Sequence, residues 1–362
     1  MNKELFINDI KQLVKREEPQ LILDHYNKLV LWQNILFVIG ISGIWIKYNF
    51  ISIISLSIFT FTKWSISGHH ICHGGYNICN VKNMNKKNFS IGFMRKIIDW
   101  LDWFLTEAWS YEHNHLHHSF LNENKDPDLI INIRNKTLLK DRYIYNTLSF
   151  IFTMITWKWI YYASNTFHNY KNKKNEINNT CFLNNAIFKY GFQFIKILLP
   201  YFIYRFLLIP LFFGYLLGSS YFYITLINLI LTEIFTNIHS FITIASNHAG
   251  NDLYQFTTTA KTKNDIIYRS ILGSTNYLCS NDFKNTFYDP DIIDFLQGYL
   301  NYQIEHHMFS DLSCLEYKLI APKIEKICKK YDVPYIKENV FIRLYKLYRI
   351  FVFLDDMKIY IE

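Results

Sequence analysis

Four long apolar runs constrain what this chain can fold into more than any other feature of its sequence. A helix needs roughly 20 residues to cross about 30 Å of hydrocarbon, and each run is close to that length. The first two runs follow one another almost directly, and so do the last two, which predicts two helical hairpins. The predicted spans lie near 29–46, 50–67, 192–217 and 220–245.

The composition predicts a second part outside the bilayer. Half of the 362 residues are hydrophobic and 18% are aromatic, yet the mean hydropathy is only +0.01, so sizeable polar segments must alternate with the spans. We therefore expect an all-α integral membrane protein with about four transmembrane helices, interfacial helices and a cytosolic helical cap. Its expected divisions are a cytosolic N-terminal segment 1–28, a membrane and cap domain 29–345, and a C-terminal tail 346–362.

Two shorter segments are placed at the membrane interface. Residues 97–109 mix Trp and Leu with acidic side chains, which favours a helix at the interface. Residues 143–164 are rich in Tyr and Trp and contain Lys158, which suits the headgroup zone as well as a span. Within the third span, Arg205 is interpreted as a side chain that snorkels to the headgroups or packs at a kink, rather than as a functional cation.

The distribution of charge indicates orientation in a membrane rather than nucleic-acid binding. The net charge is +8, and the Lys residues lie mainly in the N-terminal segment, between the spans and in the tail. The positive-inside rule predicts this pattern for cytosolic segments, so no nucleic-acid partner is expected. The six Cys residues form no Cys-x-x-Cys pair, and on a reducing, cytosolic side they are expected to be free thiols.

Nine of the 13 His residues fall in three short clusters. Two spans precede the first cluster and two more separate the second from the third, so all three should emerge on the cytosolic side. In the first cluster, GHHICHGG, His69 and His73 lie one helical turn apart, and both imidazoles can face one point. His70 points elsewhere. Taken alone, this cluster fits a polar helix end as well as a metal site.

The second cluster, YEHNHLHH, repeats this spacing with His113 and His117 and places His118 beside them. His115 lies off the shared face. Three nearby carboxylates can either orient ligating imidazoles through their second nitrogen or cap helices at the surface. They are Glu112, Asp126 and Asp128. For the last of these, the surface role is favoured.

The third cluster, LNYQIEHHMF, supplies His306 and His307, with Gln303 on the same helical side. Unpaired buried imidazoles are costly and neutral imidazole is a preferred metal ligand, so three such clusters on one side favour a metal centre over coincidence. About eight His ligands exceed the needs of one zinc ion. Two redox-active metal ions beside an apolar channel suit oxygen activation better.

The three boxes HHICH, HNHLHH and QIEHH resemble those of the membrane fatty acid desaturases in their order and in their separation by hydrophobic hairpins. The resemblance covers nearly all of the expected domain 29–345. It implies a fatty acyl substrate, as acyl-CoA or phospholipid, together with two Fe ions and O2, which is reduced to water. The Gln that opens the third box resembles the front-end group, which introduces a double bond between an existing one and the carboxyl end.

The resemblance also implies the ligand set. The family has a further ligating His after its last span, a role that falls to His248 in SNHAGND. The rival is His239, which a hydrogen bond between helices would also explain. Gln303 is carried over as a catalytic-site group that binds metal or holds water. The implied metal ligands are His69, His73, His113, His117, His118, His248, His306 and His307.

Two other functions stay open at this point. The middle box also resembles that of alkane hydroxylases, which share the metal site but give a hydroxylated product. A metal-dependent membrane receptor or transporter is a different class. Transporters, however, place their ligands near the bilayer midplane, whereas these clusters lie beyond the ends of the spans.

Partners and location follow from the same resemblance. Many front-end desaturases carry a fused cytochrome b5 domain with a His-Pro-Gly-Gly haem motif, and this sequence lacks that motif. A separate electron donor such as cytochrome b5 or ferredoxin is therefore expected, and the basic cytosolic face could dock an acidic one. The expected location is the endoplasmic reticulum, or the inner membrane if the host is a bacterium.

Overall fold

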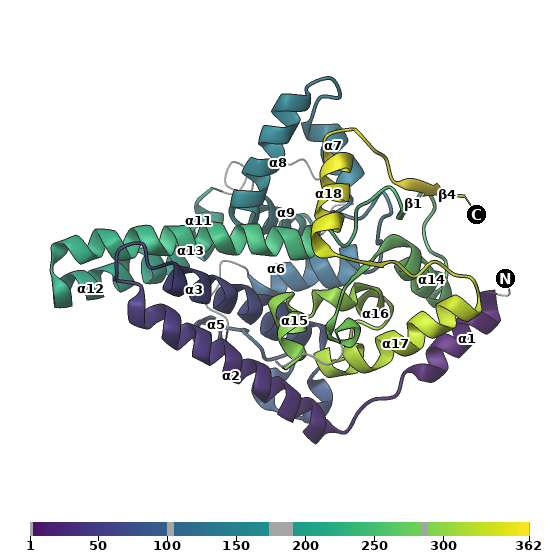
Figure 1. Ribbon diagram of the computed structural model, residues 1–362, viewed down its shortest axis with the longest axis horizontal. Coiled ribbons are helices and arrows are strands. Elements are labelled where there is room, and N and C mark those ends of the chain that lie inside the picture. Colours follow the sequence, from purple (N-terminus) through teal and green to yellow (C-terminus); the bar gives the residue numbers. More distant parts are fainter. Residues whose placement is uncertain (1–2, 100–104, 174–190, 284–288, 362) are drawn as a thin grey trace.

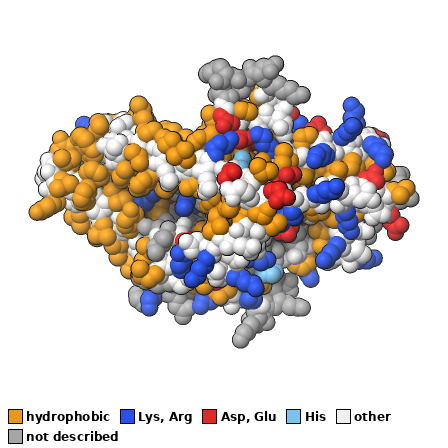
Figure 2. All heavy atoms as spheres, turned by 90° about the horizontal axis from the view of Figure 1, so that it is seen from below, with side chains coloured by type: hydrophobic (Ala, Val, Ile, Leu, Met, Phe, Trp, Pro, Cys, Tyr) orange, Lys and Arg blue, Asp and Glu red, His pale blue; other side chains and the backbone are white. Residues whose placement is uncertain are grey.

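The computed structural model is mostly helical (Figure 1) and describes residues 3–99, 105–173, 191–283 and 289–361. Five of its helices extend toward one end of the molecule. Figure 2 shows hydrophobic side chains gathered over that end and charged side chains concentrated over the other half. The five helices are α2 (Pro19–Gly43), α3 (Phe50–Thr62), α11 (Phe192–Ile203), α12 (Ile209–Leu217) and α13 (Ser219–Ala245).

Three helical stretches are long and apolar enough to cross a membrane, and they match the second, third and fourth predicted spans. They are Phe50–His73, Ile195–Leu217 and Ser219–Ala245. Most of the first predicted span lies in α2, which begins earlier than expected, at Pro19, and ends at Gly43, before residue 46; α2 is not among these stretches. The predicted first hairpin is nevertheless present. A Cβ at Gly40 of α2 would lie 2.4 Å from Leu56 Cγ of α3, so only glycine allows this close approach.

Arg205 turns into the protein rather than toward the headgroups. It lies in the π-helical turn Tyr204–Leu208, which joins α11 to α12, and its Nε is 2.8 Å from Oε1 of the fully buried Glu233 on α13. Tyr201 donates a hydrogen bond to the same carboxylate. Of the two favoured interpretations of Arg205, snorkelling is wrong, because an acidic partner on the next helix compensates its charge inside the apolar end. Packing at an irregular part of the helix fits, since the residue lies in a π-helical turn.

We expect Glu233→Leu to lower the free energy of unfolding by about 3–5 kcal/mol, because it leaves the Arg205 guanidinium without its acidic partner. The double variant Arg205→Met with Glu233→Leu should regain most of that loss, since an apolar pair of similar volume replaces the ion pair. Thermal unfolding in detergent micelles measures both. An unchanged melting temperature in the single variant would contradict the inward-facing ion pair.

One long helical segment lies across α13. α8, a π-helical turn and α9 follow one another without a break, and they run through Tyr143–Trp157, Lys158–Tyr162 and Ala163–Lys171. α8 packs on α13 and lies steeply across it in Figure 1. Because α13 is a candidate span, this orientation suits a helix that runs along a membrane surface, as expected for 143–164.

Among the described residues, four short α-helices lie between α3 and α8 in the sequence. The segment 97–109, expected to be one interfacial helix, is divided between α5 and α6, and its residues 100–104 lie outside the described part of the chain. The short helices are α4 (His69–His73), α5 (Phe93–Asp99), α6 (Thr106–Ser110) and α7 (Ile130–Thr137).

The cap is built from both ends of the chain. α1 lies beside α17 (Figure 1) and buries Phe6, Ile7 and Ile10 in the core of the cap. β4 pairs in parallel with β1, and Tyr254 lies opposite Lys358. The expected terminal segments therefore pack against the domain, and α18 crosses the boundary expected at 345. The cap elements are α1 (Lys3–Leu13), β1 (Tyr254–Phe256), α14 (Lys263–Gly273), β2 (Asn276–Tyr277), α15 (Asp291–Leu296), α16 (Gln303–Met308), α17 (Cys314–Lys330), β3 (Lys337–Glu338), α18 (Val340–Phe351) and β4 (Lys358–Tyr360).

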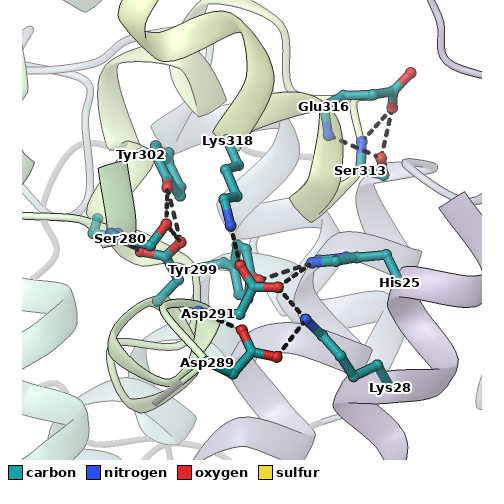
Figure 3. A network of polar contacts seen from close by, with 12 residues as sticks. His25, Lys28, Ser280, Asp289, Asp291, Tyr299, Tyr302, Ser313, Glu316 and Lys318 are labelled. Atoms are coloured by element: carbon teal, nitrogen blue, oxygen red, sulfur yellow. Dashed lines mark hydrogen bonds and ion pairs between the residues drawn. The ribbon is translucent and has the colours of Figure 1, made fainter. Parts of the chain in front are cut away.

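A network of charges joins α2 to the cap (Figure 3). Asp291, at the start of α15, accepts hydrogen bonds from Lys28 of α2 and from Lys318 of α17. His25 Nε2 lies 2.9 Å from the Tyr299 hydroxyl. Burial raises the pKa of the Asp291 carboxyl, but the hydrogen bonds from His25, Lys28 and Lys318 outweigh it and hold that pKa below its usual range. The carboxylate is therefore charged at neutral pH and links three elements.

A second carboxylate fixes the segment that precedes the third His cluster. The oxygens of the fully buried Asp294 accept hydrogen bonds from the Ser280 backbone N at 2.9 Å, from Asn301 Nδ2 at 2.6 Å and from the Tyr302 hydroxyl at 2.9 Å. Figure 3 shows the bonds from Ser280 and Tyr302. Because Asn301 and Tyr302 form the turn directly before α16, these bonds set where Gln303 begins that helix.

Candidate metal centre

The three His clusters converge at the cap end of the long helices. α3 continues through the π-helical turn Lys63–Gly68 into α4, which carries His69 and His73. The second cluster lies in another π-helical turn, Tyr111–His117, and the third lies on α16. All eight of the implied metal ligands are buried. Three segments that are far apart in the sequence therefore contribute to one internal site.

The π-helical turn explains why three residues of the second cluster share a face. The backbone N of His118 donates to the His113 carbonyl at 3.1 Å, an i to i+5 bond that widens the helix. In the wider turn, His113, His117 and His118 point to the same side, whereas His115 is exposed. The local backbone thus brings one more imidazole to the site than a regular α-helix would.

Four histidines from all three clusters form the first group. His69 Nε2 lies 3.1 Å from His113 Nε2 and 3.1 Å from His306 Nε2. His73 completes the group, and one nitrogen from each of the four imidazoles lies within 4.8 Å of the others.

A second group lies beside the first. One nitrogen from each of His117, His248 and His307 lies within 4.8 Å of the others. Gln303 Nε2 is 3.1 Å from His248 Nε2 and 3.2 Å from His307 Nε2. Turning this amide by 180° would present its Oε1, which has no hydrogen-bond partner among the described residues, to the same nitrogens or to an ion between them.

Two candidate ligands remain, His118 and His239, and only the first lies beside the two groups of histidines. His118 lies between the two groups, with its ring centroid 4.5 Å from that of His73 and 4.2 Å from that of His307. His239 is not part of either group. Its Nε2 lies 2.7 Å from the Leu296 carbonyl oxygen, and its ring contacts Phe61. The geometry therefore brings His248, and not His239, to the site.

The donor set fits metal ions better than it fits hydrogen bonding. A neutral imidazole has one N–H and one lone pair, so His69 Nε2, which lies 3.1 Å from two other Nε2 atoms, can share a proton with only one of them. Ligand nitrogens at about 2.1 Å from one ion lie about 3.0–3.4 Å apart at octahedral to tetrahedral angles. The buried Nε2 atoms of His73 and His118 also lack a hydrogen-bond partner among the described residues. These positions can hold two neighbouring ions.

In His117 and His306, a contact to the ring nitrogen Nδ1 holds the imidazole so that Nε2 faces the site. His117 Nδ1 lies 3.0 Å from Asp126 Oδ1. His306 Nδ1 lies 3.2 Å from the Tyr317 hydroxyl, which itself donates to the Phe309 carbonyl at 2.9 Å and so accepts from the imidazole. Such contacts fix the tautomer and the ring orientation of a metal-ligating His.

Burial keeps most of these imidazoles neutral. It lowers the pKa of His113, His118, His306 and His307 well below the ordinary value, and nearby His residues add to the effect. A neutral imidazole is the form that binds metal. His117 differs, because the Asp126 carboxylate outweighs burial and raises its pKa. An ion at the second group would therefore compete with a proton on His117.

Asp128 does not have the surface role that was expected. Its carboxylate accepts a hydrogen bond from the Tyr161 hydroxyl at 2.9 Å and borders an internal cavity. Burial raises its pKa to about 6. Burial, and then the charge of Asp128, raises the pKa of the neighbouring Glu112 well above its ordinary value. Burial therefore favours the protonated form of Glu112, in which the pair avoids two facing charges.

An apolar cavity of about 530 Å³ leads away from the histidines. It has the size of a site for a small ligand. Its walls come from α7, α8, α13 and α18, and its inner end touches both groups of histidines and Gln303. The aromatic residues around that inner end are Trp64, Trp109, Trp157, Tyr161 and Tyr162.

Sequence reasoning did not identify these aromatic residues. Trp157 stacks on Tyr162 with ring centroids 4.8 Å apart, and the Tyr162 hydroxyl accepts a hydrogen bond from Trp109 Nε1 at 3.0 Å. The available signal was the aromatic content of 143–164, which was attributed to the headgroup zone alone. One face of that segment in fact lines the cavity.

A helical membrane protein with an internal, histidine-rich candidate metal centre is the class that this fold and site define. Comparison with protein families is more specific. The sequence model described as fatty acid desaturase matches residues 43–339, and the chain therefore belongs to the fatty acid desaturase family.

Individual relatives match over shorter segments. An acyl-lipid (8-3)-desaturase of Physcomitrium patens is 46% identical over 46 residues, which is 13% of this chain and 10% of that protein. An NADPH-dependent stearoyl-CoA 9-desaturase of Mycobacterium tuberculosis is 27% identical over 116 residues, 31% of this chain and 25% of that protein. A Delta(8)-fatty-acid desaturase 2 of Arabidopsis thaliana is 27% identical over 89 residues, 25% of this chain and 17% of that protein.

The chain thus spans a quarter or less of the length of these curated relatives. No solved structure matches it significantly.

The contact between Asp126 and His117 predicts a measurable effect on metal affinity. We expect Asp126→Asn to weaken Fe²⁺ binding about 10–100-fold, because the carboxylate fixes the ring and raises its basicity. Asp128→Asn should have a smaller effect, since its carboxylate lies 3.9 Å from the same Nδ1. Titration of the purified protein in competition with a coloured chelator measures both. Equal affinity of the unmodified chain and Asp126→Asn would contradict this role.

Proposed function

We propose that this chain is an oxygen-dependent fatty acyl desaturase whose eight buried histidines hold two iron ions. The observation that carries the proposal is the position of the apolar cavity, whose inner end touches both groups of histidines. A methylene group of a chain bound in this cavity would lie beside the metal centre. The match to the fatty acid desaturase family supports the same reaction.

In this proposal, one iron is bound by His69, His73, His113 and His306 and the other by His117, His248 and His307. His118 stands between the two positions. Two iron ions would supply the reduction of O2: two electrons from a donor and two protons enter, two hydrogens leave adjacent acyl carbons, and a double bond and two molecules of water result. The remaining contributions come from the chain's own residues.

The residues around the cavity bind the chain, exclude water and orient the imidazoles. The stacked rings of Trp157 and Tyr162 and the side chain of Trp64 line the cavity and contact one another. Asp126 holds the Nδ1 proton of His117. Gln303 lies against His248 and His307, where it can occupy a coordination position or hold a water molecule.

Front-end regioselectivity is part of the proposal. It rests on Gln303 at the start of the third box and on the segment similar to the Arabidopsis Delta(8)-fatty-acid desaturase 2. We further propose a separate electron donor such as cytochrome b5 or ferredoxin, and an active site on the cytosolic side of the endoplasmic reticulum or of a bacterial inner membrane. The basic segments on the expected cytosolic side support this orientation.

Two histidines of the turn Tyr111–His117 provide a matched test. In a desaturase-deficient host, we expect His117→Ala to abolish the new unsaturated fatty acid and to lower the iron content. His115→Ala should leave both near the unmodified level, because this side chain is exposed and off the shared face. Gas chromatography with mass spectrometry, after derivatisation of double bonds, gives the product and the bond position. Normal activity of His117→Ala would overturn the ligand assignment, and a hydroxylated product would replace desaturation by hydroxylation.

Replacing Gln303 separates two roles for this residue. If Gln303 binds iron or holds water at the second group, Gln303→His should retain at least about tenfold more activity than Gln303→Ala, which amounts to about 1.4 kcal/mol of the barrier. The turnover rate of both variants in the same host membranes, normalised to protein amount, measures this difference. Equal rates would assign Gln303 a purely structural role.

A further inference from the structure

The outward face of α8 is apolar from its first residue as far as Phe152. Six large hydrophobic side chains are exposed on this part of the helix, and each is about half exposed or more. They are Tyr143 (49%), Ile144 (75%), Tyr145 (54%), Leu148 (62%), Ile151 (46%) and Phe152 (49%). A contiguous face of this kind is unfavourable in water and marks contact with a membrane or a partner. Since α8 lies steeply across the candidate span α13 (Figure 1), this face suits lipid at the bilayer surface.

The start of α8 carries the charges expected at the headgroup level. Lys140 and Arg142 are exposed, as is Asp141 between them, and Arg142 directly precedes the first residue of the helix, Tyr143. Basic and aromatic side chains at this position of an interfacial helix anchor it among phosphates. The apolar face that follows would then lie in the region of the acyl chains.

The same face of α8 forms the rim of the cavity. Tyr145, Leu148 and Phe152 are exposed on the outer surface and also line the cavity. Ile133 and Thr137 of α7 line it as well. The cavity therefore opens along the apolar, outward face of α8, and a mouth lined in this way suits hydrocarbon better than water.

The chemistry of the cavity favours an acyl chain that arrives from the membrane. Among the described residues that line it, Asp128 and the histidines are the ionisable groups apart from tyrosine, and none is a lysine or arginine. A headgroup phosphate would therefore stay outside, at the level of Lys140 and Arg142. A chain of a membrane lipid already lies at the depth of the mouth, whereas the chain of a water-borne thioester would first have to reach it through the headgroups.

We propose that the acyl chain enters this cavity sideways from the bilayer, across the rim formed by Tyr145, Leu148 and Phe152, while it is still esterified to a membrane phospholipid. This inference rests on the proposed function and deepens it, because it assigns the substrate class as acyl-lipid. Leu148, at the middle of the rim, controls access.

Photo-crosslinking tests access independently of turnover. The full chain is reconstituted in vesicles of phosphatidylcholine that contain a small fraction of phosphatidylcholine with a diazirine on one acyl chain. After illumination, we expect labelled peptides from the inner cavity around Tyr161 and Phe241. Leu148→Trp should lower this labelling at least tenfold by filling the rim. Ile151→Trp, on the same helix but not in the cavity lining, should change it less than twofold. Labelling of Phe212, exposed at the apolar end, controls for reconstitution.

A parallel sample replaces the lipid probe by an acyl-CoA with the same diazirine chain. Labelling of the inner cavity from acyl-CoA but not from phosphatidylcholine, or equal labelling of the Leu148→Trp and unmodified chains, would overturn lateral access. Membranes from the expressing host are assayed for desaturation at the same time. If the lipid labels the cavity but no unsaturated product forms, lateral access stands and the proposed reaction is wrong. If product forms but the lipid does not label the cavity, the proposed reaction stands and lateral access is wrong.

Discussion

The structure depends on the close approach of imidazole nitrogens at the centre of the cap end, where His69 Nε2 lies 3.1 Å from two other Nε2 atoms. Desolvated lone pairs that face each other repel, and a cation between them reverses the sign of the interaction. The three clusters come from α4, a π-helical turn and α16, so a bound ion would join three distant segments at one point. Binding of metal and completion of the fold around it are therefore linked.

The histidines could be found from the sequence because their signal is local. The spacing of His69 and His73 follows helical geometry, and the alternation of spans with clusters was enough to place the third cluster near the first two. Likewise, His248 could be named because it follows the last span directly. The structure places His248 beside His117 and His307 and gives His239 a backbone hydrogen bond. Local periodicity and the order of the spans were thus sufficient to name most of the candidate site residues.

The remainder of the site depends on contacts between segments that no local pattern specifies. The sequence contains Arg205 and Glu233 in different spans, but only the packing of α11 and α12 on α13 brings them together. Asp128 lies near a turn in the sequence and became a cavity residue because Tyr161 folds back over it. The rim on α8 could not be predicted for a similar reason. A half-exposed helix rich in aromatic residues has the same composition whether it only lies on a membrane or also borders the mouth of a cavity.

The π-helical turn Tyr111–His117 has a consequence for how this gene can change. A π turn accommodates one residue more than the regular helix around it, and here the additional residue is what aligns His113, His117 and His118. In-frame loss of a single codon in this stretch would remove the widened turn, while the helix on either side could keep its register. A missense change removes one ligand, whereas such a deletion would change the spacing that sets three of them against one another. The length of this stretch therefore matters to the site as much as the identity of its histidines.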